Sequence, residues 1–74
     1  MKIKYSAKFE GQEVGTRSSA REYTHAVLVT SEKYGHAVLG FCGSIELAQK
    51  RLEEFRKRRP ETKILGIVEV EVVG

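Results

Sequence analysis

Residues 2–9 alternate strictly between apolar and polar side chains. One set of positions is apolar and comprises Ile3, Tyr5, Ala7 and Phe9, and the other is polar and comprises Lys2, Lys4, Ser6 and Lys8. Because successive side chains of a strand point to opposite faces, this alternation predicts a half-buried strand with a lysine-lined solvent face. Such lysines also suit an edge strand, since their charge discourages pairing with another chain. A turn is expected at Gly11-Gln12.

Three more strands are expected before any helix begins. Residues 13–18 suit a short second strand, weakened by Gly15. Residues 22–30 are rich in β-branched and aromatic side chains and are apolar on both faces, which predicts a central strand. A hairpin loop over residues 31–35 then returns the chain into a fourth strand over residues 36–42, which is also apolar on both faces.

The register of this hairpin depends on the length of its turn. If the chain turns on Lys33 and Tyr34, His25 lies directly opposite Cys42. If the turn has three residues and ends at Gly35, the register shifts by one residue and the pairing of His25 with Cys42 is lost. The sequence is compatible with both alternatives.

One helix is expected after Gly43, with Ser44 as its N-cap. Apolar residues recur on one face at helical spacing, namely Ile45, Ala48, Leu52 and Phe55, with Leu47 beside them. Glutamates precede basic residues by four positions in the favourable orientation at Glu46–Lys50, Glu53–Lys57 and Glu54–Arg58. Pro60 ends the helix, because the residue before a proline disfavours helical backbone.

Residues 63–73 are expected to form the final strand, whose second half alternates valine with glutamate. The order β-β-β-β-α-β predicts an α+β fold, with a mainly antiparallel sheet of four to five strands and one amphipathic helix on one face. The passage over residues 36–73 suits a right-handed crossover that joins two parallel strands. The valine-rich end at Val72 and Val73 offers an edge for pairing between copies, so monomer and homodimer both stay open.

Length and composition restrict the class of protein. A chain of 74 residues with 41% hydrophobic and 31% charged residues suits one small globular domain over residues 1–74. Its single cysteine excludes an internal disulfide, and no Cys and His cluster offers zinc ligands. No apolar run is long enough to span a bilayer or to act as a signal peptide. We therefore expect a cytoplasmic protein without a metal, a cofactor or a membrane partner.

The formal net charge of +3 is unevenly distributed along the chain. Four adjacent basic residues end the predicted helix, namely Arg56, Lys57, Arg58 and Arg59. Cations at a helix C-terminus complement the macrodipole, and this is a purely structural explanation. Four in a row exceed what capping requires, so they are also candidates for contact with phosphate or with an acidic protein surface.

A second group of candidates precedes and opens the predicted third strand. It comprises Arg17, Arg21, Tyr23 and His25. Tyr23 and His25 fall on the same face of the strand, and Arg21 lies at its entrance. The group suits a recognition patch, or a surface on which bases stack. Alternatively, Tyr23 and His25 belong to the core beneath the helix.

Catalysis is the weakest hypothesis. Cys42 is the best candidate nucleophile and His25 a candidate base, but no third group that would orient the histidine is evident. A cysteine in an apolar strand is more typical of a core. The glycines Gly40 and Gly43 precede a helix but lack the rest of a phosphate-binding motif, so they indicate a tight turn. We therefore expect a protein that is not an enzyme.

An Arg-x-Tyr-Thr-His-Ala-Val core at residues 21–27, followed by Gly-Phe-Cys-Gly at residues 40–43, resembles small uncharacterised accessory proteins of phages and prophages. The resemblance covers residues 14–52. It implies a phage origin and importance for Arg21, Tyr23 and His25, without assigning their role. Small phage accessory proteins of this size commonly bind a host protein and block it, which is an analogy of size and origin.

These observations favour a non-catalytic binding protein, encoded by a phage, that docks on a host protein or nucleoprotein complex in the host cytoplasm. An inhibitor of a host defence complex, such as an anti-CRISPR protein, fits this description. The alternative is a small nucleic-acid-binding domain that uses Lys2, Lys4 and Lys8 together with the basic helix end.

Overall fold

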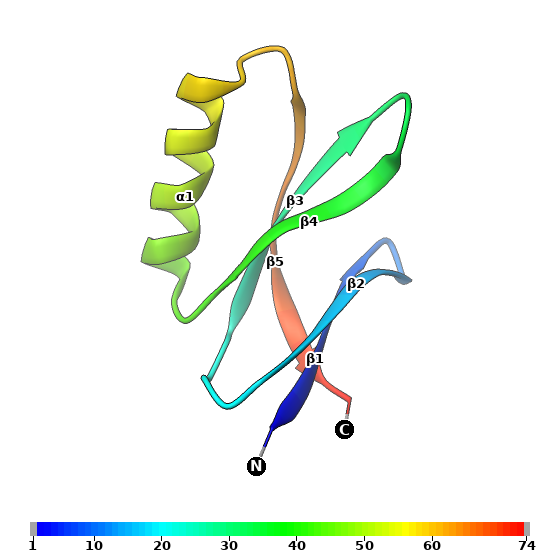
Figure 1. Cartoon of the computed structure of the whole chain (residues 1–74), viewed down its shortest axis with the longest axis vertical. Coiled ribbons are helices and arrows are strands. Elements are labelled where there is room, and N and C mark those ends of the chain that lie inside the picture. Colours follow the sequence, from blue (N-terminus) through cyan, green and yellow to red (C-terminus); the bar gives the residue numbers. More distant parts are fainter. Residues whose placement is uncertain (1, 74) are drawn as a thin grey trace.

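A computed structural model describes residues 2–73 of the protein, which form five strands and one helix. In chain order they are β1 (Ile3–Phe9), β2 (Gln12–Ser19), β3 (His25–Ser31), β4 (Gly35–Cys42), α1 (Ile45–Arg58) and β5 (Lys63–Val72). The expected order of elements and the α+β fold are confirmed. Figure 1 shows the helix along one side of a strongly twisted sheet.

All neighbouring strands of the sheet are antiparallel, in the order β2-β1-β5-β3-β4. Strands β4 and β5 both run antiparallel to β3, so the helix joins two strands of the same direction with β3 between them. The final strand is therefore the middle strand of the sheet. The apolar first half of β5 is compatible with a central place in the sheet, but it does not by itself predict one.

The placement of β1 and β5 overturns two expectations about edges. Strand β1 lies between β2 and β5 and is not an edge strand, despite its lysines. Strand β5 is not an edge either, and its valine-rich end is already paired: Val72 lies opposite Tyr5, and the Val73 N–H donates to the Lys4 carbonyl over 2.9 Å. The edge strands are β2 and β4.

The sheet curls until its two edge strands approach each other. A Cβ placed on Gly15 of β2 would lie 2.8 Å from Cγ2 of Val38 of β4, although these strands are at opposite ends of the strand order. The rings of Phe9 of β1 and His36 of β4 also lie close together, with centroids 5.4 Å apart. The curl leaves no room for a side chain at position 15 of β2, and a glycine at this position avoids the clash.

The curl divides the hydrophobic core into two parts. Inside the curled sheet, the buried residues Ala7, Ala26 and Leu28 contact further half-buried apolar side chains from β1, β2, β4 and β5. Between the sheet and α1, a second cluster is built on Val27, Cys42 and Ala48. The two faces of β3 thus face different cores, which explains why this strand is apolar on both faces.

The β3–β4 hairpin follows the first predicted register only in the part distant from its turn. Its turn has three residues, and Ser31 lies opposite Gly35, whose φ is 74°. A bulge between Val27 and Leu28 then shifts the register by one, so His25 lies opposite Cys42 after all. The second alternative was correct about the length of the turn but wrong about its end, because Gly35 already belongs to β4. It was also wrong about the lost pairing, because a bulge adds one residue to one strand.

Helix α1 begins and ends as expected. The Ser44 Oγ accepts the Leu47 N–H over 3.2 Å, and the helix ends at Arg58, two residues before Pro60. Ala48 is fully buried, but Ile45, predicted to belong to the apolar stripe, is 37% exposed. The glutamates placed four residues before lysine or arginine form no ion pair in the described part of the chain. Because Ile45 is partly exposed, the apolar stripe of α1 that contacts the sheet is shorter than predicted.

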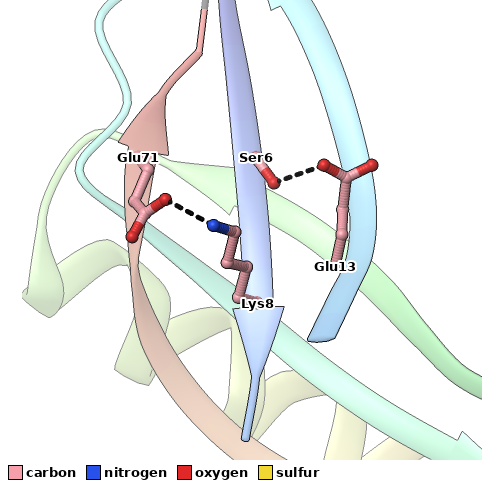
Figure 2. A network of polar contacts seen from close by, with 4 residues as sticks. All are labelled: Ser6, Lys8, Glu13 and Glu71. Atoms are coloured by element: carbon pink, nitrogen blue, oxygen red, sulfur yellow. Dashed lines mark hydrogen bonds and ion pairs between the residues drawn. The ribbon is translucent and has the colours of Figure 1, made fainter. Parts of the chain in front are cut away.

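The outer face of β1 is less exposed than its lysines indicate. Ser6 is fully buried and donates a hydrogen bond to Oε2 of Glu13 over 2.9 Å, while Lys8 forms an ion pair with Glu71 over 3.0 Å. Figure 2 shows these two contacts on either side of β1, one towards β2 and one towards β5. The Lys8–Glu71 pair is largely solvated and stabilises the fold little.

The close approach of β2 and β4 predicts that Gly15→Val destabilises the protein by about 1–3 kcal/mol, the usual cost of overpacking. Chemical denaturation followed by circular dichroism measures the change. Val38→Ala removes the obstructing methyl group, so the double variant should lose less stability than the sum of the two single variants. Additive losses would show that Gly15 and Val38 do not compete for space.

Candidate binding groove

The connection between β2 and β3 is irregular but firmly held. Residues 22–24, predicted to begin a strand, lie outside β3. The Tyr5 hydroxyl donates to the Arg21 carbonyl over 2.9 Å, and the Arg21 N–H donates to Ser19 Oγ over 3.1 Å. The Thr24 N–H donates to the Cys42 carbonyl over 2.9 Å. These bonds hold the residues between them at the end of the curled sheet.

Tyr23 lies at the centre of an aromatic cluster at this end of the sheet. Its ring centroid is 5.3 Å from that of Tyr5, in an edge-on arrangement, and 5.8 Å from that of Phe41. The Arg17 guanidinium lies over the ring, 5.7 Å from its centroid. Tyr23 thus lies neither beneath the helix nor free for stacking. The Tyr23 ring is half-buried, and its face attracts the positively charged guanidinium of Arg17 through a cation–π interaction.

A hollow of about 550 Å³ lies between the β2–β3 connection, the end of β4 and the first half of α1. Its apolar lining includes Tyr23, Phe41 and Leu47. Its basic lining comprises Arg21, Lys50 and Arg51, and its acidic lining comprises Glu22 and Glu54. The two acidic groups lower the net positive charge of the hollow without cancelling it.

Two smaller hollows share lining residues with the first. One of about 360 Å³ lies between β2 and β4 and shares Phe41 with the first, and Arg17 lies on its border. Another of about 150 Å³ shares Arg51 and Glu54 with the first hollow and extends along α1 to Arg58. We call the three together the basic groove. Its basic residues are Arg17, Arg21, Lys50, Arg51 and Arg58.

Two basic side chains of the groove, those of Arg17 and Arg51, lie against apolar or backbone surfaces. None of the five forms an ion pair with a carboxylate within residues 2–73. Arg51 lies against the backbone of Gly40: a Cβ at that position would be 3.2 Å from Arg51 Cδ and 3.3 Å from its Nε and Nη1. Arg17 rests on the ring of Tyr23. Their guanidinium groups therefore keep their capacity to bind a carboxylate or a phosphate in a bidentate manner.

The structure brings only some of the predicted site residues together. Arg17, Arg21, Tyr23 and Arg58 line the basic groove. Three other basic residues at the end of the helix are exposed and do not line it, namely Arg56, Lys57 and Arg59. Consecutive helical residues point about 100° apart, so a run of four cannot share one face. His25 is half-buried, and its Nδ1 lies 2.7 Å from Thr24 Oγ1.

Sequence reasoning missed Phe41, Leu47, Lys50 and Arg51 as groove residues. Four lining residues of α1 follow helical spacing, namely Leu47, Arg51, Glu54 and Arg58. Residues separated by three or four positions lie on one side of a helix. This mixed stripe beside the apolar stripe was a signal that could have identified the helical side of the groove.

The side chains of Cys42 and His25 have different neighbours in the structure. The Cys42 side chain belongs to the core cluster with Val27 and Ala48 and is 4% exposed. Such burial limits the access of a reagent or a substrate to the thiol. The pairing of His25 with Cys42 across β3 and β4 is a backbone register, whereas the His25 ring contacts Thr24.

Burial of Cys42 predicts that iodoacetamide modifies it slowly in the native protein and rapidly once the chain is unfolded in urea. Mass spectrometry of the two samples at matched times measures the difference. Equal rates in the two states would contradict the burial of the thiol and would restore Cys42 as a candidate nucleophile.

The hydroxyl of Tyr5 is expected to fasten the β2–β3 connection. Tyr5→Phe removes the hydrogen bond to the Arg21 carbonyl and should lower the free energy of unfolding by about 0.5–1.5 kcal/mol. Amide hydrogen exchange should also become faster at residues 20–24, since one of their restraints is lost. Unchanged exchange in this segment would show that the other hydrogen bonds hold it alone.

The described residues hold no group of three or more His, Cys, Asp or Glu side chains placed to bind a metal. The helix found in residues 2–73 lacks the length and apolar character that crossing a membrane requires. Comparisons with protein-family models, with curated proteins and with solved structures find no match to this chain.

Proposed function

We propose that this protein is a non-catalytic binding protein, encoded by a phage, that docks on a host protein or nucleoprotein complex through the basic groove. The observation that carries the proposal is the set of five basic side chains around an apolar floor, none of them in an ion pair within residues 2–73. Such a surface is complementary to an anionic partner. The phage origin is supported by the resemblance of residues 21–27 and 40–43 to phage accessory proteins.

The composition of the groove supports docking on a macromolecule. Interface hot spots are enriched in arginine and tyrosine, and apolar contacts surrounded by polar groups are typical of their anatomy. The groove combines Arg17, Arg21 and Arg51 with the half-buried rings of Tyr23 and Phe41. Small proteins with such a surface can block a host complex by occupying its binding site, as an inhibitor of a defence complex in the host cytoplasm would.

Direct binding of nucleic acid is the second candidate, because a basic groove also attracts phosphate. Two features weigh against it. Tyr23 is already engaged by Arg17, Tyr5 and Phe41, so it does not offer the stacking platform typical of single-strand binders. Lys8 is paired with Glu71, which reduces the positive character of the outer face of β1.

A comparison of two charge-reversal variants tests the proposal. The first carries Arg17→Glu, Arg21→Glu and Arg51→Glu in the groove. The second carries Arg56→Glu, Lys57→Glu and Arg59→Glu at the exposed helix end and serves as the matched control, because it changes the net charge equally. Each variant and the wild type are used to capture partners from nuclease-treated host lysate, with circular dichroism to verify folding.

We expect the wild type and the control variant to retain the same host protein or complex, and the groove variant to lose it. Loss of the partner in the control variant alone would assign docking to the helix end and contradict the proposal. In a parallel capture from lysate without nuclease treatment, retention of nucleic acid alone, lost at moderate salt, would favour the second candidate.

A further inference from the structure

The largest hollow of the basic groove has an apolar floor that the fold itself does not need. Leu47 is 56% exposed and borders the same hollow as Phe41 and Tyr23. A leucine on the first turn of α1 with most of its side chain in water contributes little to the core that Ala48 and Leu52 form. Together with the aromatic rings, it makes a surface that a large apolar side chain would shield from water.

Both basic and acidic side chains border this apolar floor. Arg21, Lys50 and Arg51 provide positive charge, whereas Glu22 and Glu54 provide acceptors beside them. A phosphodiester backbone carries no hydrogen-bond donor and a negative charge at every step, so it would be repelled by both glutamates. A peptide backbone carries an N–H at nearly every residue that can donate to a glutamate, while acidic side chains pair with the basic groups.

We propose that the hollow binds an acidic peptide segment of the docking partner, which places one large apolar side chain against Leu47 and Phe41. Its carboxylates are held by Arg21, Lys50 and Arg51, and its backbone N–H groups face Glu22 and Glu54. The hollow is open to solvent and has a volume of about 550 Å³, which leaves room for one large side chain of a peptide. This inference rests on the proposed function and specifies the chemistry of its partner.

Charge complementarity selects this occupant over a second copy of the chain. A copy that presented the same basic groove would bring like charges together, and the chain as a whole carries a formal charge of +3. An acidic segment would instead be attracted to the groove. Because salt screens this attraction, the segment would associate faster at low salt than at high salt. A large apolar residue flanked by Asp or Glu is therefore the expected motif.

Selection from a randomised heptapeptide library on the immobilised wild-type protein tests the inference. We expect the enriched peptides to contain acidic residues around one Phe, Leu, Met or Trp. The most enriched peptide is then labelled and titrated by fluorescence polarisation against the wild type, Leu47→Ala and Ile45→Ala. Ile45 is the matched control, because it is an exposed apolar residue at the start of α1 that does not line the hollow.

Leu47→Ala should weaken binding of the peptide about tenfold, the scale of one interface anchor, whereas Ile45→Ala should leave it unchanged. Replacing the apolar residue of the peptide by alanine should have a similar effect. Enrichment of peptides without acidic residues, equal effects of the two substitutions, or displacement of the peptide by an oligothymidylate at lower concentration would overturn the inference.

The inference and the proposed function fail in different ways. If the groove charge-reversal variant loses its host partner but Leu47→Ala keeps both partner and peptide, docking stands and the apolar anchor is refuted. If the acidic peptide binds as described but no host protein depends on the groove, the peptide site stands and the proposed docking function is refuted.

Discussion

The contact between Gly15 and Val38 is the constraint on which the functional surface depends. Strands β2 and β4 are the two edges of the sheet, and only its curl brings them together. Arg17 on β2 and Phe41 on β4 border the same hollow because of this approach. A flat sheet would separate them by the width of three strands. A glycine at the contact permits the curl, since any larger residue would push the edges apart.

Curling also determines where the helix can lie. The interior of the curled sheet is filled by side chains such as Ala7 and Leu28, so α1 must pack on the outer face. That contact is narrow and rests on the small buried Ala48. A narrow contact leaves the neighbouring stripe of α1 exposed, and this stripe provides Leu47, Arg51 and Arg58 to the groove. The same geometry that limits the core therefore creates the candidate site.

Local patterns predicted the elements well. The alternation in residues 2–9, the Ser44 cap and the stop before Pro60 are short-range signals, and the structure agrees with each. Long-range features were not accessible in the same way. The bulge between Val27 and Leu28 and the central place of β5 depend on pairing between residues distant in sequence, which periodicity does not encode.

The same difference between local and long-range signals explains why only part of the candidate site was predicted. Arg17, Arg21 and Tyr23 were identified because they are near one another in sequence, and the structure keeps them near one another. The four adjacent basic residues that end at Arg59 were predicted as a site because their charges are close together in sequence. Three of the four do not line the groove. Lys50 and Arg51 lie on the groove although nothing in their immediate sequence distinguishes them.

For binding an anion, we expect contacts that already hold an arginine side chain in place to be more important than the number of basic residues. A free arginine loses side-chain entropy when it binds an anion, and a solvated ion pair contributes little. Arg17 rests on the ring of Tyr23, and Arg51 lies against the backbone of Gly40, so part of that ordering is already present before a partner arrives. The exposed basic residues at the end of α1 have no comparable support. Two held guanidinium groups beside an apolar floor therefore form a more selective anion site than four adjacent charges in water.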